Sequence, residues 1–535
     1  MGNGAWTVGS DSGPTERGTT AMPRYSYERL SAQDASFLFA ERPAIHMHVA
    51  ATAIFEAGPL RKPDGGIDFE RFKRAVEGAL HRVPRYRQRL KWIPFENHPV
   101  WVDDRQFNLD YHIRHTALPR PGRDEQLKHL SARIMSQPLD RARPLWEMWL
   151  VEGLEGDRFA TITKTHHCMI DGMAGADLAQ ILLSISPEQE NAETVPYIPR
   201  PAPSSIELFV DSWGKRITMP VKIIRELTDL SRRGDGELRT RLKALGELIG
   251  WVVTPASETP MNGHLGPHRR FDWLETELAH VKALRKAFDC SVNDIILATV
   301  TGGVRDFLTR RRVRPEMIDF RVSAPVSVRS QAERGQMGNR VSSWIVRLPL
   351  EEEDVRSRVI RIREATRELK LSNQALGVDT IMKMAEFTPS MLMSLGARAA
   401  SGPINMIVTN VPGPQFPLYM LGAELQSLFP VVPLLDGTGV GIALFSYNGK
   451  LCWGFNGDFE LLPDMRFLVR AVAESFAELA KTAGVSLEPS RPVTVKQVID
   501  LRTAVAAAGG DGEVGAPRRG GAKGAGRGSA GPQTN

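Results

Sequence analysis

The stretch RFATITKTHHCMIDG (residues 158–172) couples a predicted strand to a dense group of polar side chains. Residues 158–166 have the pattern of an apolar strand, and a second such run, LWEMWLVEGL (145–154), precedes it. Successive side chains of a strand point to opposite faces, so His166 and His167 are expected to point in different directions. One imidazole can then face a cavity while the other is held by the surrounding structure.

Asp171 and Gly172, which follow the histidine pair, fit a specialised turn. Gly172 permits backbone conformations that are closed to other residues, and Asp171 is near enough to His167 to brace the turn. A buried carboxylate at Asp171 would need a partner, for which we expect an arginine. The alternative is a chance meeting of these residues near a helix start, where aspartate is favoured anyway. The same four fixed positions should arise by chance in roughly one chain of this length in a thousand, which favours a true motif.

Imidazole titrates near neutrality, so it is the side chain best suited to take a proton from a hydroxyl group. The pattern does not select one reaction. Any transfer of an acyl group from a thioester to a hydroxyl or an amine needs the same base. The motif therefore indicates acyl transfer, with the acceptor left open.

Length and composition indicate the kind of protein that contains this motif. A chain of 535 residues with 42% apolar and 24% charged residues is long enough for two or more packed domains. The net charge of +6 is mild, and we expect no nucleic-acid partner. The three cysteines (Cys168, Cys290 and Cys452) have neither zinc-site nor disulfide spacing, which favours a reducing cytoplasm and no metal. No apolar run reaches the roughly 18 residues that span a bilayer, and the first 22 residues lack a signal-peptide pattern.

Helix and strand patterns alternate on both sides of a proline-rich linker near residues 186–205. The fold class is predicted as α/β in two halves. The predicted organisation is a disordered tail (1–23), an N-terminal domain (24–186), a linker with a basic helical crossover (187–270), a C-terminal domain (271–500) and a second disordered tail (501–535).

The crossover contains an unusual concentration of positive charge. Residues 206–253 have the pattern of two amphipathic helices, and residues 215–243 include nine basic and four acidic side chains. Such a segment can lie on an anionic membrane or lipid surface. The alternative is a solvated helical face that covers a domain junction, which is the commoner meaning of a charge run.

Other catalytic motifs are not supported. The glycine-rich GTGVG (437–441) is followed by a strand pattern rather than a helix, so it does not fit a dinucleotide fold, and nothing matches a P-loop. No GxSxG elbow is present, so a serine hydrolase lacks its nucleophile. Cys168 is expected to be a buried structural cysteine.

The motif formed by His166, His167, Asp171 and Gly172 resembles the HHxxxDG motif of chloramphenicol acetyltransferases, carnitine and choline acyltransferases, peptide-synthetase condensation domains and bacterial wax ester synthase/diacylglycerol acyltransferases. Further stretches resemble the last family, in its order. They are LSAQDASFLFAERPAIHMHV (30–49), PLDRARPLWEMWLVEGL (138–154), TPMNGHLGPHRRF (259–271), SVNDIILATVTGGVR (291–305), PVSVR followed by GNRVSSW (325–344), and NMIVTNVPGP (405–414). The resemblance covers about residues 28–500.

The resemblance implies a role for each matching residue. It makes His167 the general base and His166 a supporting residue, and it implies two chloramphenicol-acetyltransferase-like domains with a tunnel between them. Asn293 would lie near the active centre, where its amide could donate to the oxyanion. Alternatively, Asn293 and Ser291 only cap the following helix.

The remaining matches are expected to contribute to substrate binding. These residues are Gly172, Asp294 of the Asn-Asp motif, Trp146 of the Pro-Leu-Trp motif, and Glu41, an acid near the tunnel. Trp146 also opens an apolar strand, which makes a structural role the simpler interpretation for that residue.

The activity that the resemblance implies is transfer of a long-chain acyl group from acyl-CoA to diacylglycerol or a long-chain alcohol, with no cofactor. The protein is expected to be cytoplasmic, with peripheral association at a membrane or lipid droplet through residues 206–253 as an open question. Two alternatives remain at this point. One is a condensation-type enzyme that uses carrier-protein thioesters, and the other is a non-catalytic lipid-surface protein.

Overall fold

The computed structural model describes residues 25–169, 181–188, 194–217, 255–327, 341–371 and 404–488. All of these described residues belong to one compact unit. The predicted tails (1–23 and 501–535) and residues 218–254 of the basic crossover lie outside the described residues.

The first sheet is built around the strand that leads into the histidine pair. It has six strands in the order β12-β13-β2-β7-β6-β5, and all neighbours are antiparallel except β5 and β6. The predicted strand pair at 145–154 and 158–166 is confirmed as β6 and β7. The bounds are β2 (His48–Glu56), β5 (Ile113–Ala117), β6 (Trp146–Leu154), β7 (Arg158–His166), β12 (Tyr419–Met420) and β13 (Ala423–Val431).

The second sheet comes from the C-terminal half and also has six strands, in the order β10-β9-β11-β14-β15-β8. Its last hairpin, β14 to β15, turns at Asn448 and Gly449, which both have positive φ as a tight two-residue turn requires. The bounds are β8 (Arg269–Glu277), β9 (Phe320–Ser327), β10 (Val341–Leu348), β11 (Met406–Pro412), β14 (Val440–Tyr447) and β15 (Lys450–Asp458).

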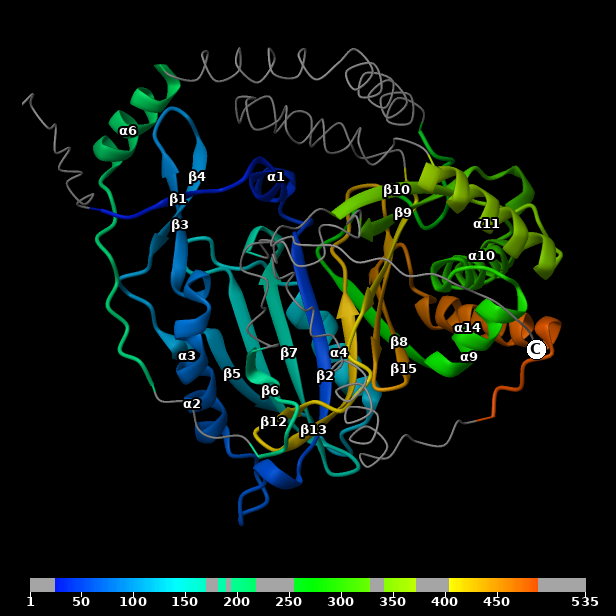
Figure 1. Ribbon diagram of the computed structural model, residues 1–535, viewed down its shortest axis with the longest axis horizontal. Coiled ribbons are helices and arrows are strands. Elements are labelled where there is room, and N and C mark those ends of the chain that lie inside the picture. Colours follow the sequence, from blue (N-terminus) through cyan, green and yellow to red (C-terminus); the bar gives the residue numbers. More distant parts are fainter. Residues whose placement is uncertain are drawn as a thin grey trace, which may run out of the picture. The chain divides into compact units, whose positions relative to one another are not determined.

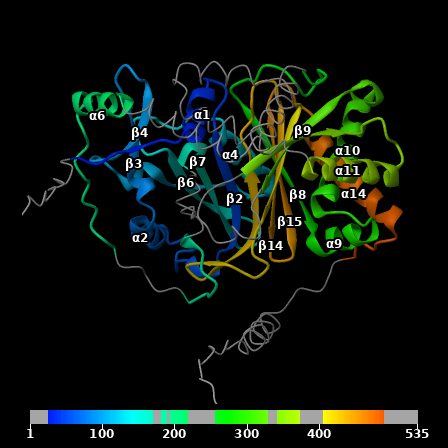
Figure 2. The ribbon, with the colours of Figure 1, turned by 45° about the horizontal axis from the view of Figure 1, so that its top comes forward.

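Helices cover the second sheet on the side away from the first sheet (Figures 1 and 2). They are α9 (Leu278–Ala287), α10 (Val292–Arg310), α11 (Val355–Leu371) and α14 (Met465–Ala483). α10 and α14 approach closely because α10 carries Gly302 and Gly303 where they meet. A Cβ atom on Gly303 would lie 2.5 Å from Val472 Cγ2, so a larger residue there would push the two helices apart.

The helices of the first half are shorter than α10, α11 and α14 of the second half. They are α1 (Ala32–Ala40), α2 (Phe69–Ala79), α3 (Leu109–His112) and α4 (Asp124–Met135), with 3₁₀ turns at Gly58–Leu60, Leu80–Arg82, Pro84–Arg87 and, in the second half, Pro315–Met317. α4 packs against β8 and shares a buried core with both sheets, which includes Leu127, Trp273 and Phe429. The rings of Trp273 and Phe429 stack with centroids 4.5 Å apart. Apolar packing therefore joins the two halves directly.

A small three-stranded sheet lies beside the first half, in the order β1 (Glu28–Arg29), β4 (His98–Asp103), β3 (Gln88–Ile93). The described part of the predicted linker packs against it. Arg200 forms an ion pair with Asp103, and helix α6 (Ser205–Ile217) follows. The linker is thus an ordered strap at residues 194–217.

The predicted α/β fold in two halves is confirmed, but the C-terminal half contributes one segment to the first sheet. β12 and β13 (419–431) belong to the predicted C-terminal domain, yet β13 pairs with β2 in the first sheet, with Leu428 opposite Ala53. The predicted boundaries do not include this crossover. The physical reason is that strand pairing across several hundred residues leaves no local pattern in the sequence.

Candidate active site

The two histidines of the motif lie at the end of β7 and diverge there. His166 is the last residue of β7 and is 1% exposed, whereas His167 begins the 3₁₀ turn η4 (His167–Met169) and is partly exposed. His167 donates its backbone N–H to the carbonyl oxygen of Met47 over 2.7 Å. The two side chains have different neighbours, as strand alternation predicts.

His166 faces inward, and its hydrogen bonds define its tautomer. Its Nδ1 accepts a hydrogen bond of 3.1 Å from the backbone N–H of Cys168. A ring nitrogen that accepts carries no proton, so the proton lies on Nε2, which is 3.6 Å from Oε1 of Glu41. His166 therefore links Glu41 to the turn that holds His167, which fits the predicted supporting role.

Glu41 lies at the centre of a cluster that contains His166 and His48. Its Oε1 is 3.5 Å from Nε2 of His48, and its Oε2 accepts a hydrogen bond of 3.0 Å from Nε of Arg141. Burial raises the pKa of Glu41. Nevertheless, contacts with His166, His48 and Arg141 outweigh burial and hold the pKa of this carboxyl well below its usual range. Glu41 is thus a buried anion beside the histidines, and its predicted contact with substrate stays a prediction.

His46 and His48 complete the cluster, and the sequence motif does not include them. His48 pairs with His166 across β2 and β7, and its ring lies 5.8 Å from that of His166 in an edge-on arrangement. The rings of His46 and His48 stack 5.3 Å apart, and burial lowers the pKa of His48 to about 3. Their alternation as His-Met-His is a usable signal, because alternate residues share one face of a strand. The partner strand, however, cannot be read from the sequence.

His167 is held with its imidazole neutral. Its ring stacks on Phe37 of α1 with centroids 3.9 Å apart, and its Nδ1 is buried without a hydrogen-bond partner among the described residues. Burial lowers the pKa of His167 to about 4. A neutral imidazole fixed between an aromatic ring and a strand end can accept a proton through its other nitrogen, Nε2.

The loop from Glu41 to Met47 is held in place by the C-terminal half. Arg42 and Ile45 form a short backbone bridge, and Arg42 forms an ion pair of 2.7 Å with Asp436. Arg269, which is 7% exposed, donates to the carbonyl oxygen of Ala44 through Nη2. The second half therefore clamps the loop that supplies Glu41 and Met47 to the histidines.

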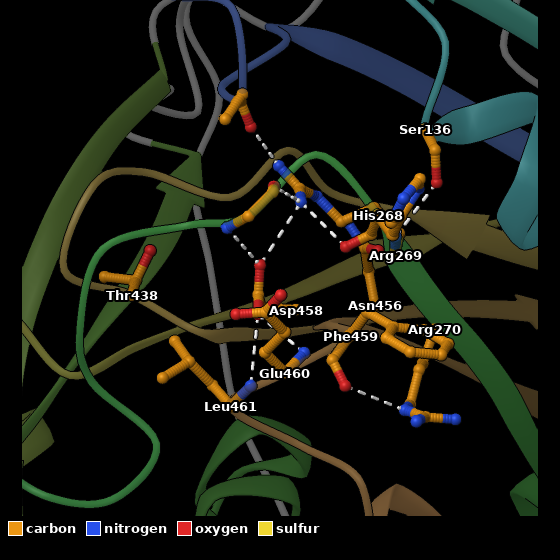
Figure 3. A network of polar contacts seen from close by, with 12 residues as sticks. Ser136, His268, Arg269, Arg270, Thr438, Asn456, Asp458, Phe459, Glu460 and Leu461 are labelled. Carbon is orange, nitrogen blue, oxygen red and sulfur yellow. Dashed lines mark hydrogen bonds and ion pairs between the residues drawn. The ribbon is translucent and has the colours of Figure 1, made fainter.

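A buried polar network supports this clamp (Figure 3). Nη1 of Arg269 lies 3.4 Å from Oδ2 of Asp458, which is fully buried, and it also donates to the carbonyl oxygen of Gly266. The backbone N–H of Arg269 donates over 2.9 Å to Oγ of Ser136, the residue that ends α4. Arg269 thus joins β15, α4 and the loop of Glu41 in one hydrogen-bonded unit.

Asn293 lies in the first turn of α10, and Ser291 is the residue that caps this helix. The Ser291 side chain accepts from the N–H of Asp294, and the carboxylate of Asp294 accepts in return from the N–H of Ser291. Asn293 takes no part in the cap. Its Oδ1 accepts a hydrogen bond of 2.9 Å from Asn410, which leaves the amide nitrogen as the donor end. Its predicted contact with the oxyanion stays a prediction.

Two predicted substrate-binding residues have structural partners instead. Besides capping α10, Asp294 accepts a hydrogen bond of 2.7 Å from Thr366 of α11 and is 2% exposed. Trp146 is 1% exposed, donates from Nε1 to the Tyr86 carbonyl over 2.8 Å and stacks on His112. Substrate binding by either residue stays a prediction.

Three other expectations belong with this site. Asp171, with its expected arginine partner, and Gly172 lie outside the described residues. The expected tunnel between the halves stays a prediction as well. Cys168 is 1% exposed, and burial raises its pKa well above the usual value, so this thiol is a packing residue beside His167 and not a nucleophile.

Comparison with known proteins identifies the family to which the chain belongs. The model of the wax ester synthase/diacylglycerol acyltransferase catalytic domain matches residues 30–296, and the WS/DGAT C-terminal domain matches residues 337–480. The chain is 32% identical to the probable diacylglycerol O-acyltransferase tgs1 of Mycobacterium tuberculosis, over 87% of this chain and 97% of that protein. A putative diacylglycerol O-acyltransferase of Mycobacterium bovis matches to the same extent.

Solved structures show the same architecture. The wax ester synthase/diacylglycerol acyltransferase of Marinobacter aquaeolei VT8 superposes with a TM-score of 0.59 at 26% identity, over 85% of this chain and 100% of that chain. The first condensation domain of the CDA synthetase superposes with a TM-score of 0.55 at 16% identity, over 88% of this chain and 100% of that one, which shows a shared fold alone. The protein is an acyltransferase, and the chain belongs to the wax ester synthase/diacylglycerol acyltransferase family.

Proposed function

We propose that this protein transfers a long-chain acyl group from acyl-CoA to the hydroxyl group of diacylglycerol or of a long-chain alcohol, with His167 as the general base. The observation that carries the proposal is the state of His167. Its imidazole is neutral and stacks on Phe37, its backbone N–H donates to Met47, and the residue lies at a strand end that adjoins an anion-centred histidine cluster. The names of the mycobacterial and Marinobacter relatives support the choice of acceptors.

The proposed reaction is a direct transfer. Nε2 of His167 takes the proton of the acceptor hydroxyl while the hydroxyl oxygen attacks the thioester carbonyl carbon. The carbonyl oxygen gains negative charge, to which the amide nitrogen of Asn293 or a backbone N–H donates. When the carbon–sulfur bond breaks, the imidazolium returns its proton to the leaving thiolate, which gives CoA as a free thiol. No step requires a covalent enzyme intermediate or a cofactor.

Glu41 and His166 are positioning residues in this proposal. His166 holds the N–H of Cys168, which follows His167 directly, so the orientation of His166 determines the start of the turn. Glu41 holds His166 at Nε2 and also accepts from the backbone N–H of Met47, the residue whose carbonyl binds His167. The carboxylate of Glu41 thus contacts both residues that hold the backbone around His167, namely His166 and Met47.

The proposed location is the cytoplasm, with peripheral association at a lipid surface through residues 206–253. None of the helices in the described parts of the chain is long and apolar enough to cross a bilayer.

A competition experiment tests the activity. Purified protein is incubated with palmitoyl-CoA and equimolar dioleoylglycerol and hexadecanol, and released thiol, triacylglycerol and wax ester are quantified together. We expect thiol release to equal the sum of the two esters, and the product ratio to give the preferred acceptor. Thiol release without ester would mean hydrolysis. Transfer only from a carrier-protein thioester would favour the condensation-type alternative, and an absence of turnover with retained lipid binding would overturn the enzymatic proposal.

A further inference from the structure

Asn410, near the end of β11, holds the side chain of Asn293 by a hydrogen bond to which the proposed function gives no role. Its Nδ2 donates over 2.9 Å to Oδ1 of Asn293, in the first turn of α10. The two residues are 117 positions apart in the chain, so the tertiary fold, and not local structure, brings them together. A hydrogen bond between two side-chain amides restricts the orientation of both.

Strand alternation explains why Asn410 faces α10. Met406 and Val408 of β11 belong to the buried core that the second sheet shares with its helices. Alternate residues of a strand share one face, so Asn410 is the next member of this row. A polar side chain therefore stands where the two preceding members are apolar, and it reaches the start of α10 from the sheet.

The bond to Asn293 is not needed to hold the start of α10. Ser291 and Asp294 cap the helix reciprocally, and Thr366 of α11 donates to Asp294 over 2.7 Å. These bonds fix the backbone of the first turn, but they do not restrict the side chain of Asn293, which is exposed. The orientation of the Asn293 amide is therefore set by Asn410 and not by the cap.

The bond also decides which end of the Asn293 amide is available to another group. A side-chain amide carries an acceptor oxygen and a donor nitrogen, and Asn410 engages the oxygen of Asn293. The donor nitrogen is left for an incoming acceptor. Without Asn410 the amide could turn over and present its oxygen to a developing negative charge, which it would repel. The bond thus keeps a donor in place before the charge appears.

From this arrangement we infer that Asn410 is a positioning residue, which orients Asn293 as the donor to the oxyanion of acyl transfer. The inference rests on the proposed function, in which either Asn293 or a backbone N–H donates to this oxygen. It selects Asn293 and names the residue that acts through it, while Asn410 itself does not touch the reacting atoms. The effect falls on kcat, because the thioester oxygen gains its charge only after the hydroxyl attacks.

A double-mutant cycle tests the inference on the full chain, with palmitoyl-CoA and dioleoylglycerol as substrates. Asn293→Ala should lower kcat roughly a hundred-fold and Asn410→Ala about ten-fold, each with little change in KM. The double variant should be no slower than Asn293→Ala, because Asn410 acts only through the Asn293 amide. Gln415→Ala is the matched control and should keep the wild-type kcat, since the Gln415 amide donates to Gly413 and Ser446 instead.

Asn410→Asp gives a second readout that a purely structural role would not produce. Aspartate has nearly the same shape as asparagine, but its carboxylate can only accept. The Asn293 amide should then turn its NH₂ group toward residue 410 and its oxygen toward the substrate, so Asn410→Asp should be slower than Asn410→Ala. The same aspartate combined with Asn293→Ala measures the effect of the added charge alone.

Three outcomes would overturn the inference. A double variant in which the two single effects multiply would give Asn410 a role that does not pass through Asn293. A lower melting temperature of Asn410→Ala with an unchanged kcat would assign the bond to the fold. A wild-type kcat in Asn293→Ala would leave a backbone N–H as the donor. In that last case His167→Ala should still abolish thiol release, so the proposed activity would stand although this inference fails.

Discussion

Oε1 of Glu41 lies 3.6 Å from Nε2 of His166, so the carboxylate of Glu41 faces the first histidine of the motif and not the second. The second histidine, His167, takes its position from backbone contacts and from stacking on Phe37. This arrangement separates the roles within the motif. In the proposed reaction, His167 exchanges a proton with substrate while His166 and Glu41 hold the turn.

Removal of the imidazole of His167 is expected to abolish transfer. In His167→Ala, the rate of acyl transfer should fall roughly a hundred- to ten-thousand-fold, because no other group takes the hydroxyl proton. Thiol release from palmitoyl-CoA measures the loss, and circular dichroism checks the fold. His129→Ala is the matched control, since His129 is exposed on α4. A folded His167→Ala protein with wild-type turnover would sink the assignment.

The negative charge of Glu41 is expected to affect kcat more than the size of the side chain does. Glu41→Gln keeps the size of the side chain but removes the anion between His166, His48 and Arg141. We expect kcat to fall about ten-fold or more while KM for acyl-CoA changes little, because the base is displaced and the substrate contacts are not. The control is Glu152→Gln, which alters a similar pair with His115 on β5 and β6. Equal effects of the two variants on kcat would argue against a positioning role for Glu41.

The pH profile should reflect the low pKa of His167. Protonated His167 cannot accept a proton, so activity should be lost as the pH falls through the pKa of about 4, and not through the usual value near 6.5. Initial rates of kcat/KM between pH 7 and pH 5 should therefore change little in protein that remains folded. A half-maximal rate near pH 6.5 would show that the imidazole is less buried in the free enzyme than this structure indicates.

Buried histidines should make the fold sensitive to acid. Burial lowers the pKa of His48 to about 3 and that of His112 to about 4, whereas both take up protons near pH 6.5 in the unfolded chain. Above pH 6.5 both histidines are neutral in the folded and in the unfolded chain. Below that pH the unfolded chain takes up protons first, so the free energy of unfolding should fall by roughly 2 kcal/mol per residue between pH 7 and pH 5. Urea unfolding of wild type and His112→Gln at both pH values measures this. The variant should show a smaller fall, and identical falls would contradict the assignment for His112.

The clamp from the C-terminal half is expected to affect catalysis at a distance. Arg269→Lys keeps a positive charge near Asp458 but cannot reproduce the several contacts of the guanidinium, including the bond to Ala44. We expect a lower kcat and a lower melting temperature. Arg270→Lys, one residue away on the exposed side of β8, is the control and should change neither. If Arg269→Lys lowers only the melting temperature, the network stabilises the fold without positioning the loop of Glu41.

Local patterns were sufficient to predict the class of the fold and the position of its centre. The strand at 158–166, the divergence of His166 and His167 and the helix capped at Ser291 all depend on residues that are close in the chain. Such features follow from backbone geometry, because strand alternation and helix capping act within a few residues. The motif also indicated acyl transfer from its own composition.

Long-range contacts decided the rest of the site. Glu41, His48 and His166 come together only because β2 pairs with β7 in one register, and the loop of Glu41 is clamped by Arg269 and Asp436 from the far half of the chain. The resemblance implies that Trp146 and Asp294 bind substrate, which stays a prediction, and the structure adds buried structural partners for both. Pairing register and burial depend on which distant segments meet, and that choice is made by packing the whole core rather than by any short stretch.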